Sequence, residues 1–311
     1  HGVGPQGPLR DATRRRGTAG VTPFTFQTTR SVLCETGATG KIGAIMRDMR
    51  WGVSAHAKDI WTSPEWEKRE KLQEGTFGAT FLATCTGFGA QHLKDLADTP
   101  DRVDLIYHGL DLGRFPAPPE SPAPSEPVRF LSVGRLVEKK GFDNLIEALA
   151  LLPSDLDWHW DHIGGGGNGD KLRTRAEALG IAHRITWHGA CDQPEVIEAM
   201  RRSHVFVLPS RIASDGDRDG LPNVLMEAAS QKLCILSTPV SAIPEFIDNG
   251  THGLLSDDAP SALAEAMRDL ATDPGKRTAM ADAAYDRLTA DFLMAPGIEI
   301  LDKRLATLFQ G

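Results

Sequence analysis

Two basic residues five positions apart, Arg135 and Lys140, follow an apolar run and precede a predicted helix. An arginine guanidinium can bind two phosphate oxygens at once, and a lysine ammonium adds a point charge. The amino end of the helix that begins near Gly141 would add unpaired backbone N–H groups. The pair is therefore a candidate site for a diphosphate, and a merely solvated basic loop is the alternative.

A second candidate site is the acidic loop at residues 215–222, which reads DGDRDGLP. Its DxDxDG run is typical of the start of an EF-hand calcium loop, but the twelfth position, which must be acidic, is Met226. A DxD site for a divalent metal and a diphosphate stays open, as does a solvated loop. Glu227 lies in the second turn of the helix predicted to begin at Pro222. Its carboxylate would either bind the vicinal hydroxyls of a ribose or face solvent.

A glycine-rich loop at residues 164–169 fits the pattern GxGxxG through Gly164, Gly166 and Gly169. A nicotinamide dinucleotide site also needs an acidic residue at the end of the next strand, about 20 residues further on. That strand ends at residues 186–189, which read TWHG and contain no acid. An NAD-dependent dehydrogenase is therefore disfavoured. A turn that lets the backbone approach a nucleotide and a plain tight turn both remain open.

These loops all follow predicted strands in the second half of the chain. Strands are expected at residues 128–133, 158–163, 184–187, 204–208 and 233–237, and helices at 142–152, 171–179, 196–202 and 222–231. This alternation predicts a doubly wound α/β domain with a mostly parallel sheet. Ligands of such sheets bind beyond the carboxyl ends of the strands. The sequence therefore predicts one binding edge that unites the basic, glycine-rich and acidic loops.

Proline makes up half of the segment at residues 116–127 (PAPPESPAPSEP), which predicts an extended linker and a domain boundary. We expect disorder at 1–20, a partial Rossmann-like N-terminal domain at 21–115, a Rossmann-like C-terminal domain at 128–290, and a helix at 291–311 that packs back on the first domain. In the first half, strands are expected at 51–54, 81–85 and 103–107, and helices at 41–50 and 64–73.

The overall composition excludes several classes of protein. A net charge of -8 over 311 residues argues against a nucleic-acid partner, which would require a basic surface. The four cysteines are far apart, so we expect reduced thiols in a cytoplasmic protein. No apolar run approaches the roughly 18 residues that span a bilayer. Peripheral contact with the inner membrane stays open.

Together the motifs resemble the C-terminal half of a retaining GT-B glycosyltransferase of family 4, also called glycosyl transferases group 1. The matching segments, in family order, read FLSVGRLVEKKGFDNLIEAL, HIGGGGNGDKL, RITWHGA, PSRIASDGDRDGLPNVLMEAA and STPVSAIPEFIDNGTHGLL. SAHAKDIW at 54–61 and IYHGLDLGRF at 106–115 extend the resemblance into the first half. It implies two Rossmann-like domains that face a cleft. Residues 1–50 match no part of the family, which predicts that the N-terminal domain is incomplete.

The family signature is a pair of acids separated by seven residues, here Asp219 and Glu227. The resemblance implies that Glu227 binds the ribose, that Asp219 faces the donor sugar, and that Arg135 and Lys140 bind the diphosphate. Asp219 departs from the family, which usually has the longer glutamate. The resemblance completes the donor site with residues of the surrounding loops: Gly134, Gly164, Gly166, His188, Gly189, Gly220, Leu221, Pro222 and Asn223.

His56, in SAHAKD, matches a first-domain histidine that contacts the transferred sugar, and Asp59 would lie beside it in the cleft. The resemblance thus makes His56, Asp219, Arg135 and Lys140 the catalytic candidates. It implies transfer of a hexosyl unit from a nucleoside diphosphate sugar to a saccharide or lipid-linked saccharide, without a metal or other cofactor. Similar chains serve bacterial exopolysaccharide, colanic-acid and lipopolysaccharide synthesis. The alternatives are a nucleotide-sugar-binding remnant without catalysis and a GT-B sugar-nucleotide epimerase.

Overall fold

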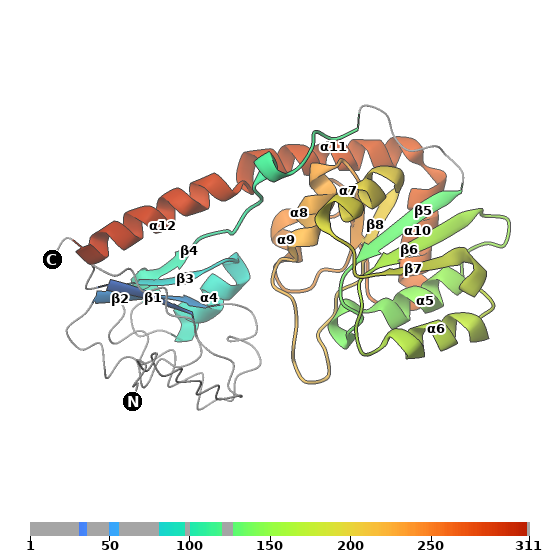
Figure 1. Ribbon diagram of the computed structural model, residues 1–311, viewed down its shortest axis with the longest axis horizontal. Helices are drawn as coiled ribbons and strands as arrows, with labels where there is room; N and C mark the ends of the chain where they lie inside the picture. Colours follow the sequence, from blue (N-terminus) through green and yellow to red (C-terminus); the bar gives the residue numbers. More distant parts are fainter. Residues whose placement is uncertain (1–30, 36–49, 56–80, 97–99, 120–126, 310–311) are drawn as a thin grey trace, which may run out of the picture.

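The computed structural model describes residues 31–35, 50–55, 81–96, 100–119 and 127–309, and the architecture below refers to these. They form two lobes, each built on a parallel sheet (Figure 1). The first sheet has the order β1-β2-β3-β4, with strands Ser31–Glu35, Arg50–Ala55, Phe81–Thr84 and Val103–Leu105. The α/β class predicted from the sequence is therefore confirmed.

The second sheet has six strands in the order β10-β9-β8-β5-β6-β7, all parallel. In chain order they are β5 (Val128–Val133), β6 (Trp158–Ile163), β7 (Ile185–Gly189), β8 (Val205–Leu208), β9 (Cys234–Ser237) and β10 (Leu254–Leu255). One of the two central strands, β8, reads VFVL and is buried along its whole length, as expected for a parallel strand covered on both faces.

Helices cover both faces of the second sheet. One face carries α5 (Phe142–Ala150), α6 (Gly169–Ala178) and α10 (Pro260–Thr272); the other carries α7 (Gln193–Arg202), α8 (Asn223–Ser230) and α11 (Pro274–Asp291) (Figure 1). The chain leaves β5 toward one face and β8 toward the other, so the topological switch point lies between these neighbouring strands. Ligands of doubly wound sheets bind at the carboxyl ends of the strands beside such a point.

The two lobes are joined by two crossing segments that lie side by side. The Leu110 N–H donates to the carbonyl of Phe292 at 2.8 Å, and the Met294 N–H donates to the carbonyl of Leu110 at 3.1 Å. Gly109 has a positive φ of 61°, and a Cβ there would lie 2.4 Å from the Leu293 backbone. Glycine is therefore required for this close approach.

After the second crossing, α12 (Met294–Phe309) returns to the first lobe (Figure 1). Leu301 and Leu305 of this helix pack against Phe81, Ala83 and Ile106 of the first lobe. Arg304 also forms an ion pair with Asp104 in β4. Within the described part of the chain, no helix combines the length and apolar character that a bilayer crossing requires.

Most expected elements of the second lobe are confirmed, several of them with ends shifted by one to three residues. The strands expected at 128–133 and 158–163 match β5 and β6, and the helix expected at 222–231 is α8. The expectations missed β1, β10, α4 (Gly87–Leu96), α9 (Ile243–Phe246), α10 and α11. The expected helix at 64–73 lies outside the described residues, as does 41–49 of the helix expected at 41–50. Its last residue, Arg50, instead begins β2.

Candidate active site

A cavity of about 540 Å³ lies between the two lobes, at the carboxyl ends of β3 and β5 and at the start of α8. Nine residues singled out from the sequence line it: Gly134, Arg135, Lys140, Asp219, Gly220, Leu221, Pro222, Asn223 and Glu227. The opposite wall comes from Thr84, Cys85, Thr86, Phe88 and His108. A cavity of this size is large enough for a small-molecule ligand.

The basic loop is fixed by a glycine between a short 3-10 turn and α5. Gly141 has a φ of 67°, and a Cβ there would lie 2.0 Å from the carbonyl oxygen of Pro209, so no other residue fits without a shift of the backbone. The loop after β5 is thereby pressed against the loop after β8. Because those strands flank the switch point, the basic and acidic loops meet.

Ion pairs join these two loops. The Lys140 Nζ lies 2.6 Å from Oδ2 of Asp219, and the neighbouring Lys139 Nζ lies 3.1 Å from Oδ1 of Asp217 and 3.3 Å from Oδ1 of Asp219. The sequence reasoning missed Lys139, whose signal was its position beside Lys140 in a loop facing several acids. Since two of the loop's carboxylates bind ammonium groups, the EF-hand and DxD alternatives are not supported.

Arg135 differs from the two lysines. Its side chain is exposed at the cavity wall, and it forms no ion pair with any residue that the structure describes. An exposed guanidinium at the mouth of a cavity can bind two oxygens of an incoming anion. The basic loop after β5 therefore holds Lys140, which is already paired with Asp219, and Arg135, which is available to a ligand.

Glu227 lines the same cavity from the second turn of α8. Its carboxylate is partly buried, and burial raises its pKa. None of the described residues donates a hydrogen bond to it. A partly buried carboxylate is stabilised by hydrogen-bond donors. A ligand with two adjacent hydroxyl groups would supply them.

The start of α8 also faces the cavity. The residue before the helix is Pro222, and no side chain caps the first N–H groups among the described residues. Asn223 and Val224, the first residues of the helix, line the cavity. Unpaired N–H groups at a helix start favour anions.

The glycine-rich loop contributes by close packing and does not line this cavity. A Cβ on Gly164 would lie 2.0 Å from the carbonyl oxygen of Gly134, and one on Gly166 would lie 2.6 Å from that of Leu136. These glycines let the loops after β5 and β6 touch, and the Gly164 N–H in turn donates to Gly189 at 2.6 Å. Gly164 and Gly166 therefore pack against the backbone of the basic loop at Gly134 and Leu136, and Gly189 holds Gly164 in place.

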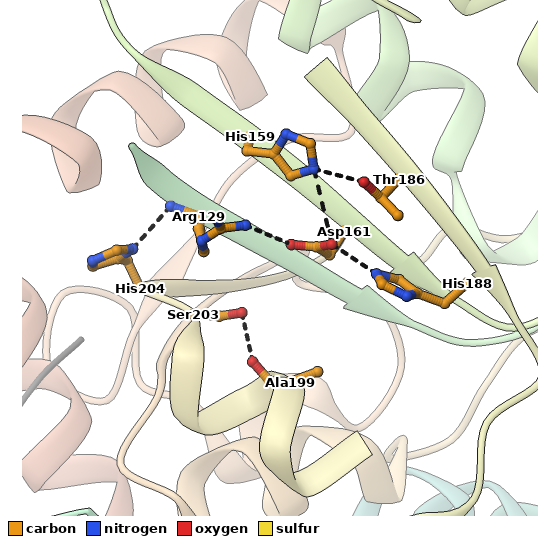
Figure 2. A network of polar contacts seen from close by, with 8 residues as sticks. All are labelled: Arg129, His159, Asp161, Thr186, His188, Ala199, Ser203 and His204. Atoms are coloured by element: carbon orange, nitrogen blue, oxygen red, sulfur yellow. Dashed lines mark hydrogen bonds and ion pairs between the residues drawn. The ribbon is translucent and has the colours of Figure 1, made fainter. Parts of the chain in front are cut away.

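His188 also lies away from the cavity between the lobes. Its Nε2 is 2.7 Å from Oδ1 of Asp161, and Figure 2 shows this pair with His159 and Arg129 on one face of the sheet. His188 lines a separate cavity of about 360 Å³ between β7 and α7. His188 does not line the cavity between the lobes, so this structure does not bring it to the predicted nucleotide-sugar site. His56 and Asp59 lie outside the described residues.

The wall from the first lobe was not anticipated. Thr84 ends β3, Thr86 and Phe88 follow it, and His108 lies in the first crossing segment. The signal for these residues was weak, because one strand end in an incomplete domain does not identify a site. That these first-lobe residues face Asp219 and Glu227 follows only from the way in which the two lobes pack together.

Comparison with known proteins is consistent with this geometry. Residues 114–287 match the family described as glycosyl transferases group 1. A putative colanic acid biosynthesis glycosyltransferase, WcaL of Salmonella typhimurium, is 28% identical over 274 residues, which are 87% of this chain and 64% of the relative. The amylovoran biosynthesis glycosyltransferase AmsK of Erwinia amylovora is 35% identical over 143 residues, 46% of this chain and 34% of the relative. The chain thus spans 64% of the length of WcaL.

Solved structures share the two-lobed architecture. Anabaena HepE, solved in complex with UDP and glucose, has a TM-score of 0.71 at 16% identity, covering 88% of this chain and 78% of its own. Sucrose-phosphate synthase of Thermosynechococcus elongatus has a TM-score of 0.74 at 19% identity, covering 89% and 73%. These likenesses establish the fold. The chain has the GT-B fold and belongs to the glycosyl transferases group 1 family.

Proposed function

We propose that this chain transfers a hexosyl unit from a nucleoside diphosphate sugar to a hydroxyl of a saccharide or lipid-linked saccharide. The observation that carries the proposal is the cavity of about 540 Å³ between the lobes, which Arg135, Lys140, the start of α8 and Glu227 line together. Cations and helix N–H groups suit a diphosphate, and a partly buried carboxylate without a donor suits a ribose. Family membership and the named functions of WcaL and AmsK support a role in polysaccharide synthesis.

The difficult step in this reaction is the departure of the negatively charged diphosphate. Arg135 and Lys140 would stabilise the charge that develops on it more strongly than the charge of the bound donor. One such preorganised donor is typically worth about 2.7–4 kcal/mol of transition-state stabilisation. The two cations and the amino end of α8 would together stabilise the negative charge of the leaving diphosphate, a role that a metal ion has in other transferases.

We infer that the anomeric configuration is retained by attack on the face from which the diphosphate leaves. The bond between the anomeric carbon and the diphosphate oxygen breaks, and its electron pair leaves with the diphosphate. The acceptor oxygen forms the new bond, and its proton passes to a phosphate oxygen of the leaving group. Among the described residues that line the cavity, the only carboxylates are Asp219, paired with lysines, and Glu227, on the ribose side. Trapping of a covalent glycosyl-enzyme would contradict this mechanism.

The test is a screen of UDP-, GDP-, ADP- and dTDP-sugars by thermal shift, followed by mass spectrometry of products formed with a saccharide acceptor. We expect one donor to raise the melting temperature and the acceptor to gain the mass of one hexosyl unit. Binding without any product would favour the non-catalytic remnant. A donor sugar that changes configuration without an acceptor would indicate an epimerase. The cytoplasmic location and the peripheral membrane contact remain predictions.

A further inference from the structure

Glu245 connects the two lobes beside the first crossing segment. It belongs to α9 (Ile243–Phe246) of the second lobe, yet every hydrogen bond that its carboxylate accepts from a described residue comes from the first. Oε2 accepts from the Gly87 N–H at 2.7 Å and from the Tyr107 hydroxyl at 2.7 Å, and Oε1 accepts from the Phe88 N–H at 2.7 Å. These donors are 138 to 158 positions away in the sequence.

The two N–H donors are the first of α4, so the carboxylate acts as a cap supplied by the other lobe. The first N–H groups of a helix have no partner within the helix, and the positive end of the helix dipole favours an anion there. A Cβ on Gly87 would lie 3.2 Å from Oε2 of Glu245, so the carboxylate sits against a residue without a side chain. Hydrogen bonds to an ionised acceptor are about twice as strong as neutral ones.

The third donor ties the same carboxylate to the crossing segment. Burial, and next the hydrogen bond to Glu245, raise the pKa of the Tyr107 hydroxyl, which keeps it protonated as a donor. The Tyr107 ring packs on Phe292, with 4.9 Å between the ring centroids. On the other side, Arg287 donates to the backbone carbonyl of Glu245 at 3.0 Å. Glu245 is therefore held from both lobes.

The segment that this carboxylate fixes is part of the active-site wall. Thr86 and Phe88, which flank Gly87, both line the cavity opposite Asp219 and Glu227. The Thr86 hydroxyl oxygen accepts from the Gly89 N–H at 3.0 Å, which fixes the other side of the turn. Phe88 lines the cavity and keeps 42% of its surface exposed. An aromatic ring held there by its own backbone offers an apolar surface to a sugar ring.

We propose that Glu245 is a positioning residue for hexosyl transfer. It holds the first-lobe wall of the cavity at a fixed distance from the basic loop after β5 and the acidic loop after β8. This inference rests on the proposed function. The donor is bound by the second lobe, whereas the acceptor must be placed against it by the first. Loss of Glu245 should therefore affect the use of acceptor and leave nucleotide binding almost unchanged. A displacement of about 1 Å in such a wall can cost roughly 100-fold in rate.

The experiment compares Glu245→Ala and Tyr107→Phe with the control Glu265→Ala, which removes an exposed acid of α10. For Glu245→Ala we expect roughly a 10- to 100-fold loss of kcat/KM for the acceptor, and nucleotide affinity within about twofold of the parent by calorimetry. Tyr107→Phe, which keeps the two N–H bonds, should show a smaller loss in the same parameter. Equal kcat/KM in Glu245→Ala and Glu265→Ala would overturn the proposal, and so would a parallel loss of nucleotide affinity.

A second readout does not depend on catalysis. Hydrogen exchange of a peptide that covers residues 86–96 should accelerate in Glu245→Ala, whereas exchange of residues 223–231 stays unchanged. Unchanged exchange at 86–96 would overturn the positioning role even if no donor sugar is ever transferred. Absence of transfer by the parent protein, together with faster exchange in the variant, would contradict the proposed function and support the positioning of the wall.

Discussion

The Nζ of Lys140 lies 2.6 Å from Oδ2 of Asp219, so a cation proposed for the diphosphate is bound to the acid proposed for the donor sugar. Both side chains are largely shielded, with 12% and 16% of their surfaces exposed. The pair places the ammonium at the cavity wall before any ligand arrives. Lys139 also reaches Asp219, at 3.3 Å, so removal of Lys140 would still leave this carboxylate with a partner.

The first prediction concerns the two cations of the basic loop. Replacing Arg135 or Lys140 by alanine should lower kcat by about 100- to 1,000-fold each, because each donor stabilises the leaving diphosphate. The melting temperature should stay close to that of the parent, since Arg135 has no ion pair among the described residues and Asp219 keeps Lys139. The exposed Lys171→Ala provides the control. Normal turnover in both variants would refute the diphosphate assignment.

The second prediction concerns Glu227 and pH. Since burial raises the pKa of its carboxyl group, the affinity for the nucleotide should fall as the pH is lowered through that raised pKa, where the carboxylate takes up a proton. Glu227→Gln should bind the nucleotide more weakly and without this pH dependence. Calorimetry with UDP and GDP between pH 4 and 8 would measure both effects. An affinity in the variant equal to that of the parent would exclude the ribose role.

The third prediction concerns His162, which is fully buried beside Phe142 and Trp187, with ring centroids 4.8 and 5.4 Å away. Burial lowers its pKa from 6.5 to about 4. The unfolded chain therefore binds the proton more tightly, and stability is full above pH 6.5 and is lost as the pH falls toward 4. The loss attributable to this residue amounts to about 3 kcal/mol.

Denaturant unfolding at several pH values checks this assignment. His162→Leu should show a smaller loss of free energy of unfolding between pH 6.5 and 4 than the parent. The exposed His183→Gln should keep the slope of the parent. Identical slopes in the parent and His162→Leu would show that other groups cause the acid sensitivity.

The fourth prediction concerns Ser241, whose φ of 53° is left-handed and whose hydroxyl oxygen is buried without a partner among the described residues. The left-handed conformation costs a residue with a side chain about 1–2 kcal/mol, whereas the extra freedom of glycine in the unfolded chain costs about 0.4–1 kcal/mol. Ser241→Gly should therefore raise the free energy of unfolding by about 1 kcal/mol. Ser261→Gly, in the first turn of α10, should lower it; a loss of stability in Ser241→Gly would contradict the strain argument.

The amino-acid sequence by itself determined the second lobe and the loops that carry its chemistry. Parallel strands buried on both faces read as short apolar runs, and the VFVL run of β8, inside the strand expected at 204–208, is one of them. The capping box of Asp192 and Glu195 is likewise a local signal for the start of α7 at Gln193, although the helix was expected to begin only at residue 196. Because these signals depend on neighbours only a few residues apart, they can be read without the fold.

Only the tertiary structure decided which of the predicted side chains face one another. It paired Lys140 with Asp219, turned His188 toward Asp161, and brought Glu245 to Gly87 across 158 positions of sequence. Each of these contacts depends on how strands pack at the switch point or how the lobes meet. Such contacts are set by the packing of whole elements, and no local spacing in the sequence records them.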